Sequence, residues 1–206
     1  MLDLFAKGGI FMWPLLAMLF FGLVVAFERF YTLGKAQINS KEFFAQIQEA
    51  LKQGGPEAAA EVCSNTRGPV ASVLHAGLLR LDRGLDHVEK AISDSGAIEM
   101  AFLEKGMVWL STVANIAPLL GFLGTVSGMI NSFEAIAAAG DVDPSVVATG
   151  ISEALITTAG GLMIAIPIQA FHNYFVSKID KIIIDMQESS TMFIEELIQL
   201  GYGKDN

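Results

Sequence analysis

Three long stretches without a charged side chain constrain this chain more than any other feature of its sequence. They cover Gly8–Phe27 (20 residues), Gly106–Phe133 (28 residues) and Ala154–Ser177 (24 residues). About 20 apolar residues in a helix, rising about 1.5 Å each, cross a hydrocarbon core about 30 Å thick. A chain of 206 residues, 52% hydrophobic and 17% charged, has too little polar surface to bury three such helices in a soluble core. We therefore predict an all-α integral membrane protein with three transmembrane helices.

The distribution of cations predicts how the chain is oriented. Of 13 lysines and arginines, only Lys7 precedes the first stretch, and the short segment between the second and third stretches has none. Cytoplasmic loops carry an excess of Lys and Arg, so we expect a multi-pass protein of the cell inner membrane with a periplasmic N-terminus and a cytoplasmic C-terminus. The expected segments are a first transmembrane helix over 1–33, a cytoplasmic helical domain over 34–105, a second transmembrane helix over 106–137, a periplasmic loop over 138–147, a third transmembrane helix over 148–177 and a cytoplasmic C-terminal helix over 178–206.

The regions beside the apolar stretches carry further signals. Arg29 and Lys35 follow the first stretch instead of preceding it, which indicates an uncleaved anchor rather than a signal peptide. The Gly-Gly-Pro sequence at 54–56 predicts a break between two helices of the cytoplasmic domain. After the third stretch, apolar residues recur at helical spacing. The second and third transmembrane helices are therefore expected to extend into the cytoplasmic helical domain, the third as a long amphipathic helix.

Small and polar residues form a stripe along the second and third transmembrane helices. In steps of three and four, the stripes contain Ala114, Pro118, Gly121, Thr125, Gly128 and Ser132, and then Ala154, Thr158, Gly161, Ala165 and, after Ile168, His172. Pro118 and Pro167 permit kinks, and Gly124 with Gly128 forms a further packing motif. Such stripes bring transmembrane helices close together, and threonine hydroxyls, which both donate and accept hydrogen bonds, also line polar paths. The residues alone leave packing and conduction both open.

Glu153 is the most unusual residue in the expected membrane region. It follows an uncharged stretch that begins at Pro144, and an unpaired carboxylate deep in a bilayer costs about 2.5 kcal/mol or more. Its side chain is therefore protonated, paired, exposed to water in a cavity, or close to the outer interface. The sequence does not choose among these, but it makes Glu153 a candidate functional residue. Glu134 is expected at the outer interface.

The other reactive residue types are too scattered to form a site. Cys63 is the sole cysteine, which excludes a disulfide within the chain and a cysteine-based metal cluster. His75, His87 and His172 lie in different segments without ligand spacing. No nucleophile, base and orienting acid occur together, and no phosphate-binding glycine loop follows a strand. We expect no enzyme, no catalytic residues, no metal or other cofactor, and no nucleic-acid partner.

Two segments resemble the signature helices of the MotA/TolQ/ExbB proton channel family. They are APLLGFLGTVSGMINSF at Ala117–Phe133 and ISEALITTAGGLMIAIPIQAFHNYF at Ile151–Phe175. A weaker likeness covers GPVASVLHAGL at Gly68–Leu78. Three spans with the N-terminus outside are similar to ExbB and TolQ, whereas MotA proteins have four spans and a longer chain. The resemblance is therefore nearest to the ExbB and TolQ branch.

This resemblance implies the pore-forming subunit of a motor that the proton motive force drives, working on the cell envelope or on outer-membrane transport. It implies a homopentamer whose second and third spans surround a pore that holds a dimer of a single-span ExbD/TolR-type protein. That protein's membrane aspartate would carry protons, Thr125 and Thr158 would line the route, and Glu153 would shape its entrance or a subunit contact. The alternatives are a membrane scaffold whose stripes only pack, or a small-solute transporter with a midplane site at Glu153 and the proline breaks.

Overall fold

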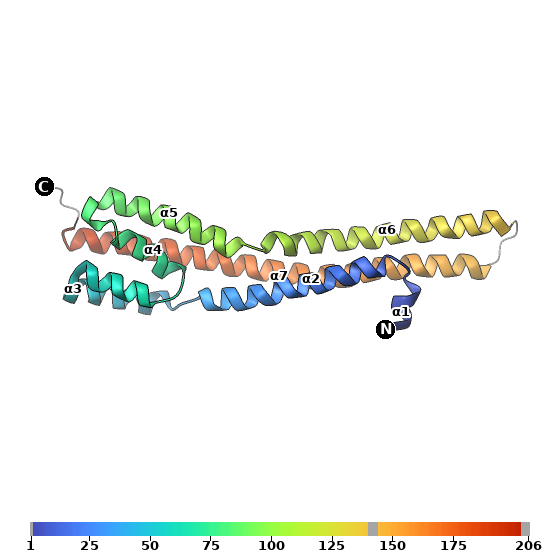
Figure 1. Cartoon of the computed structure of the whole chain (residues 1–206), viewed down its shortest axis with the longest axis horizontal. Coiled ribbons are helices and arrows are strands. Elements are labelled where there is room, and N and C mark those ends of the chain that lie inside the picture. The colour runs from blue at the N-terminus through green and yellow to red at the C-terminus, as the bar shows by residue number, and fades with distance from the viewer. Residues whose placement is uncertain (1, 140–143, 203–206) are drawn as a thin grey trace. The chain divides into compact units, whose positions relative to one another are not determined.

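Helices account for nearly all of the computed structural model, which describes residues 2–139 and 144–202 (Figure 1). They are α1 (Leu2–Lys7), α2 (Met12–Ala36), α3 (Ser40–Asn65), α4 (Pro69–Leu78), the 3-10 helix η1 (Leu81–Arg83), α5 (Leu85–Glu104), α6 (Met107–Ala139) and α7 (Pro144–Gln199). No strand occurs within the described ranges. Three helical stretches are long and apolar enough to cross a membrane. The predicted all-α fold with three transmembrane helices is confirmed.

The chain divides into two compact units. The first contains residues 1–28 and 106–174, and the second contains residues 29–105 and 175–206. Helices α2 and α7 contribute residues to both units, whereas α6 lies in the first and α5 in the second. The helical conformation is interrupted between α5 and α6 at Gly106, whose φ of 87° lies in the left-handed region that favours glycine.

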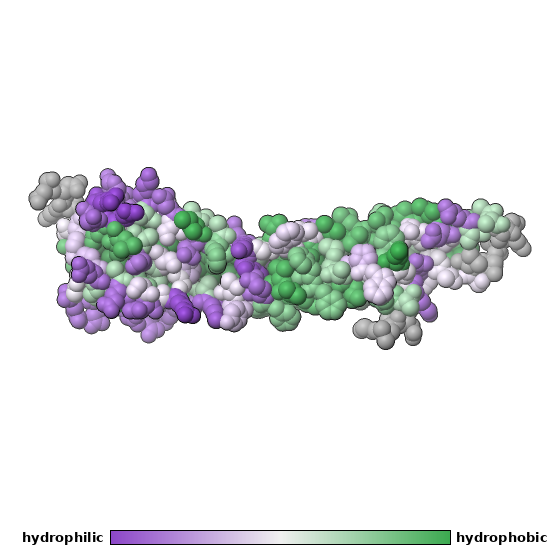
Figure 2. Space-filling view, viewed as in Figure 1, coloured by the Kyte–Doolittle hydropathy of each residue, from purple (hydrophilic) through white to green (hydrophobic). Residues whose placement is uncertain are grey.

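The first unit exposes large apolar side chains along each of its three long helices. The exposed fraction runs from 63% at Phe133 to 71% at Phe27, with Trp13, Leu119 and Met163 between these values. Figure 2 shows the hydrophobic surface that such side chains form on this unit. Soluble proteins rarely leave an apolar surface of this extent in water, whereas the surface matches the hydrocarbon of a bilayer. The first unit therefore has the kind of surface that fits a bilayer.

Helix α2 packs against both other long helices of the first unit. A Cβ atom placed on Gly22 would lie 2.9 Å from Ile168 Cδ1 and 3.2 Å from Val113 Cγ1, so only glycine fits there without a shift of its neighbours. The rings of Phe21 and Trp109 meet edge to face with their centroids 5.8 Å apart. These contacts join α2, α6 and α7 into one bundle.

The second unit has an apolar core of the kind found in soluble helical proteins. Leu33, Ile47, Leu74, Val88 and Phe193 are all buried, and they come from α2, α3, α4, α5 and α7 in turn. The backbone of α3 breaks at position 55, where the glycine has a φ of 72°, and this confirms the predicted break at 54–56. The α7 part of this unit buries one face, which confirms the predicted amphipathic continuation of the third span. That face consists of Phe175, Ile179, Ile182, Met186, Phe193 and Leu197.

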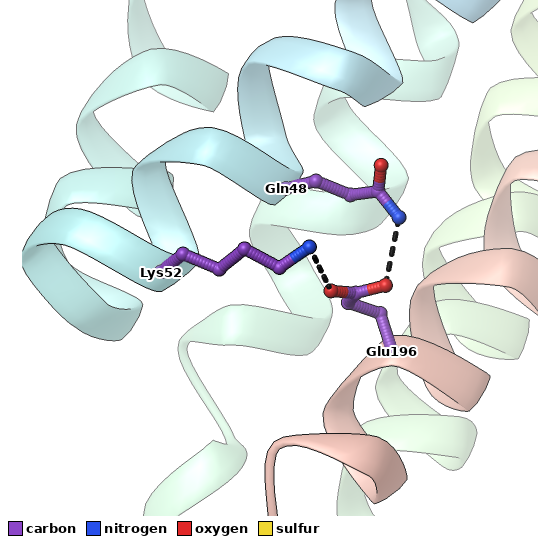
Figure 3. Close-up of polar contacts among 3 residues, drawn as sticks. All are labelled: Gln48, Lys52 and Glu196. Carbon is purple, nitrogen blue, oxygen red and sulfur yellow. Dashed lines mark hydrogen bonds and ion pairs between the residues drawn. The ribbon is translucent and has the colours of Figure 1, made fainter.

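A polar contact links α3 to the far end of α7. The Glu196 carboxylate, almost completely buried, accepts a hydrogen bond of 2.7 Å from Gln48 Nε2 and lies 3.2 Å from Lys52 Nζ (Figure 3). Gln48 and Lys52 are one helical turn apart, so their side chains reach the carboxylate from the same side of α3. A buried carboxylate is tolerated in this way because its charge is paired and its oxygens are hydrogen-bonded.

The sidedness and the limits of the expected segments stay predictions. Residues 140–143 of the expected periplasmic loop at 138–147 lie outside the described residues. Glu134, which the sequence places at the outer interface, is exposed on the last turns of α6. This exposure is compatible with contact to water or to lipid headgroups.

Candidate functional site

The stripes of small residues bring the backbones of α6 and α7 into direct contact. A Cβ atom on Gly121 would lie 2.8 Å from the Thr157 carbonyl oxygen, and one on Gly161 would lie 2.5 Å from the Ala117 carbonyl oxygen. At the next contact, a Cβ atom on Gly128 would lie 3.0 Å from the Gly150 carbonyl oxygen. Side chains at these glycines would force the helices apart, so the glycines determine how closely the two backbones approach.

Thr158 connects the two helices through its hydroxyl. Its Oγ1 donates a hydrogen bond of 3.1 Å to the Gly121 carbonyl oxygen, thirty-seven residues earlier in the chain. The side chain is half-buried, so the hydroxyl lies at the edge of the α6–α7 contact rather than in its interior. A hydroxyl at such an edge can give up its bond to the carbonyl and bind water or a partner instead.

Thr125 lies one helical turn beyond Gly121 on α6. It is half-buried, and its Oγ1 donates to the Phe122 carbonyl oxygen within the same helix. Because Thr158 bonds to Gly121, the two threonines belong to the same stretch of the α6–α7 contact. In the described structure each hydroxyl donates to a backbone carbonyl, and neither donates to the other.

Glu153 lies away from this contact, on the side of α7 that packs against the start of α2. A Cβ atom on Gly9 would collide with Glu153 Oε1 and would lie 2.8 Å from its Cδ. Its sequence neighbour Ala154 is buried against α6, where a Cβ atom on Gly128 would lie 3.2 Å from the Ala154 Cβ. The three candidate polar residues therefore do not form one cluster, since Thr125 and Thr158 lie beside the α6–α7 contact and Glu153 lies beside α2.

The remaining residues of the stripes differ in burial. Ser132 is buried and donates a 2.9 Å hydrogen bond to the Gly128 carbonyl oxygen, and Ala165 is buried as well. Pro118 is half-buried, whereas Pro167 is exposed on α7. In the described chain, the close helix contact thus involves the small residues more directly than the prolines.

Sequence reasoning missed Thr157, which is more deeply buried than its neighbour Thr158. Thr157 is 1% exposed, and its Oγ1 donates to the Ala154 carbonyl oxygen at 2.8 Å. A Cβ atom on Gly124 would lie 2.5 Å from Thr157 Oγ1, so this glycine leaves the space that the threonine fills. The sequence contains two adjacent threonines with nothing to distinguish them. In the structure Thr157 lies on the face of α7 that meets α6, whereas Thr158 lies at the edge of that face.

A second omission is an open groove of about 500 Å³ near the other end of the α6–α7 pair, with polar residues among a mainly apolar lining. Its polar lining consists of Ser111, Thr112, Asn115 and His172, with Asn115 Nδ2 donating to Ser111 Oγ at 3.3 Å. Counting back from Thr125 in steps of three and four through position 122 reaches Pro118, Asn115 and Ser111. The predicted stripe instead passed from Pro118 to Ala114, which is one residue out of register with the groove.

The described residues offer no site for a metal ion, because no three His, Cys, Asp or Glu side chains among them lie close enough to share one. Cys63 is buried in the second unit, and burial raises the pKa of its thiol to about 12. A thiol with this pKa is protonated at neutral pH, so it is a poor ligand and a poor nucleophile.

Comparison with known proteins identifies the family. The model of the MotA/TolQ/ExbB proton channel family matches residues 65–188, which include α6 and most of α7. A biopolymer transport protein ExbB homologue of Methanothermobacter thermautotrophicus is 29% identical over 180 residues, covering 87% of this chain and 64% of the relative. An ExbB-like biopolymer transport protein of Synechocystis is 33% identical over 170 residues (81% and 66%), and TolQ of the Tol-Pal system of Pseudomonas aeruginosa is 36% identical over 102 residues (50% and 44%).

The alignment spans a little under two thirds of the length of the first two relatives. The family match itself covers more than half of this chain and includes both helices that carry the stripes. Together with the three apolar helices, it indicates a protein of the inner membrane. The chain belongs to the MotA/TolQ/ExbB proton channel family.

Proposed function

We propose that this chain is the channel-forming subunit of a machine in the inner membrane that the proton motive force drives. In this proposal five copies surround a dimer of a single-span protein of the ExbD/TolR type, and α6 and α7 form the wall of the pore. The assembly couples proton flow to work on the cell envelope or on outer-membrane transport. The N-terminus is periplasmic and the C-terminus is cytoplasmic, as the distribution of cations suggests.

The observation that carries the proposal is the Thr158 hydroxyl, which bridges α7 to the Gly121 carbonyl of α6 at the edge of a closely packed pair of helices. Polar side chains inside a membrane are costly, and they generally face protein or a water-filled cavity rather than lipid. Large apolar side chains such as Leu119 and Met163 are exposed on the same two helices and suit the lipid. The polar side chains at the edge of the α6–α7 contact and the apolar side chains exposed elsewhere on the two helices together support a pore on the Thr125 and Thr158 side.

In the proposed motor, proton flow is coupled to movement through one titrating group on the partner, its membrane aspartate. A proton that crosses the membrane releases about 2.3 kcal/mol per 100 mV of potential. When the partner's aspartate is ionised, the hydroxyls of Thr125 and Thr158 can donate hydrogen bonds to it, and bonds to a charged group contribute about 1.5–3 kcal/mol. Protonation weakens these bonds, so the inner dimer can rotate to the next copy of the wall. Glu153 contributes at the entrance of the route or at a subunit contact.

The test is a Thr158→Val variant, which keeps the shape of the side chain and removes only its hydroxyl. The complete complex with its single-span partner is reconstituted in vesicles, and the proton flux under an imposed potential is measured. We expect the flux to fall about tenfold or more, the equivalent of one lost hydrogen bond to a charged group. The matched control is Thr191→Val, because Thr191 is exposed on the α7 part of the second unit and bonds to its own helix. Equal fluxes in the two variants would contradict the role of Thr158.

A membrane scaffold is the second candidate, and one observation favours it. The close approach at Gly121, Gly128 and Gly161 is what helix packing alone would also produce. A scaffold predicts that a protonophore leaves the activity of the complex unchanged. The proposed motor predicts that the protonophore stops the activity of the complex. It also predicts that vesicles containing this chain without its partner take up no small solute, whereas a small-solute transporter would take it up.

A further inference from the structure

The turn before α2 lies directly against Glu153. Gly9 is three residues before the first residue of α2, and a Cβ atom at this position would overlap Glu153 Oε1 and lie 2.8 Å from Cδ. The carboxylate of Glu153, which is half-buried, therefore packs over the bare backbone of Gly9. The N-terminal end of α2 also carries a partial positive charge that attracts a carboxylate.

The backbone conformation at Gly9 adds a second requirement for glycine. Its φ is 67°, in the left-handed region where a side chain clashes with the following carbonyl. The turn can therefore reach Glu153 only if the residue at position 9 has no Cβ atom.

The contact belongs to a continuous face of α7. A Cβ atom on Gly8 would lie 3.1 Å from Ile156 Cγ2, and one on Gly160 would lie 3.5 Å from Met12 Sδ. Glu153, Ile156 and Gly160 are three and four residues apart, so they lie on one side of the helix. The carboxylate thus lies at one end of a packed seam between α2 and α7.

We propose that Gly9 is a positioning residue for Glu153, and that the turn before α2 forms one wall of the entrance to the proton route. This proposal rests on the proposed function, in which Glu153 contributes at that entrance. The first transmembrane helix then has a role in conduction, because a displacement of its N-terminal turn moves the carboxylate. The α6–α7 pair alone does not complete the entrance.

The experiment compares proton flux through the complete reconstituted complex for five variants. Gly9→Ala places a methyl group where the carboxylate lies, and we expect the flux to fall about tenfold, since misplacing a functional group by about 1 Å costs up to about 100-fold. Gly201→Ala is the matched control, because Gly201 has a similar φ of 86° and no neighbouring atom within 4 Å of its Cβ position. Glu153→Asp shortens the acid, and the double variant Gly9→Ala with Glu153→Asp relieves the overlap.

The proposal predicts that the double variant recovers a flux several times that of Gly9→Ala, while Gly201→Ala matches the unmodified protein. It is overturned if Gly9→Ala conducts normally. It is also overturned if the double variant is as inactive as Gly9→Ala. The same holds if both variants fail to accumulate in the membrane, because the loss of flux then comes from backbone strain. Glu153→Gln separates the two claims. Normal flux in Glu153→Gln removes the role of Glu153 in the proposed function, whereas loss in Glu153→Gln with normal flux in Gly9→Ala removes only the role of Gly9.

Discussion

Gly124 on α6 leaves the space that the buried side chain of Thr157 on α7 fills. A Cβ atom on Gly124 would lie 2.5 Å from Oγ1, 2.7 Å from Cβ and 3.0 Å from Cγ2 of Thr157. We expect Gly124→Ala to lower the free energy of unfolding in detergent by about 1–3 kcal/mol, the usual cost of overpacking. Adding Thr157→Ala removes two of the three opposing atoms and should recover part of this loss.

The control for that prediction is Gly34→Ala. Gly34 lies within α2 with no neighbouring atom within 4 Å of its Cβ position, so alanine should be neutral or should stabilise by up to about 1 kcal/mol. Equal destabilisation by Gly124→Ala and Gly34→Ala would mean that the close contact at Gly124 is not what determines stability.

Cys63 gives a prediction for pH dependence. Its pKa is raised by burial from 9.0 to about 12, so the folded protein keeps the thiol protonated while the unfolded chain begins to release the proton near pH 9. The unfolded state then binds fewer protons than the folded state, and stability falls as the pH rises from about 9 to about 12. The folded protein should react slowly with a maleimide at pH 8 and rapidly once it is unfolded, with Cys63→Ala as the blank. Rapid labelling of the folded protein would show that the thiol is accessible.

At the scale of elements, the contact between α3 and α7 makes a specific prediction for Glu196. Its carboxylate is held by Gln48 and Lys52, but the side chain of Lys52 is 57% exposed, which weakens the ion pair through solvent screening. We expect Glu196→Gln to lower the free energy of unfolding by about 0.5–1.5 kcal/mol, mainly through its buried hydrogen bond. The neighbouring Glu195 is exposed, so Glu195→Gln should have little effect. Thermal unfolding of both variants checks this, and a larger loss in Glu195→Gln would refute the assignment.

The sequence predicts the helices better than it predicts which residues form the contacts between them. Long uncharged stretches predict transmembrane helices because the bilayer requires a minimum length, and the Gly-Gly-Pro sequence at 54–56 predicts a break because glycine adopts left-handed φ values and proline stops a helix. Spacing alone could not distinguish Thr157 from Thr158, since a rotation of α7 by about 100° decides which of the two faces α6. It also could not reveal that Glu153 lies against Gly9, because that contact joins residues far apart in the chain.

At the scale of the whole molecule, the two units have surfaces of different chemistry that fit different surroundings. The first unit exposes apolar side chains and buries its glycine-rich contacts, as expected for a part that lies in lipid. The second unit has an apolar core and a hydrophilic surface, as Figure 2 shows, and it includes the buried α7 face. This division supports a membrane wall that continues into a domain in water, which is the arrangement that the proposed channel subunit needs.

The most direct measurement is an experimental structure of the complex purified from the membrane with its single-span partner. The account predicts several copies of this chain around one enclosed axis, with the hydroxyls of Thr125 and Thr158 facing that axis and the partner's aspartate at their level. Leu119 and Met163 should face lipid. A structure in which Thr125 and Thr158 face acyl chains, or in which the chains enclose no axis, would contradict it.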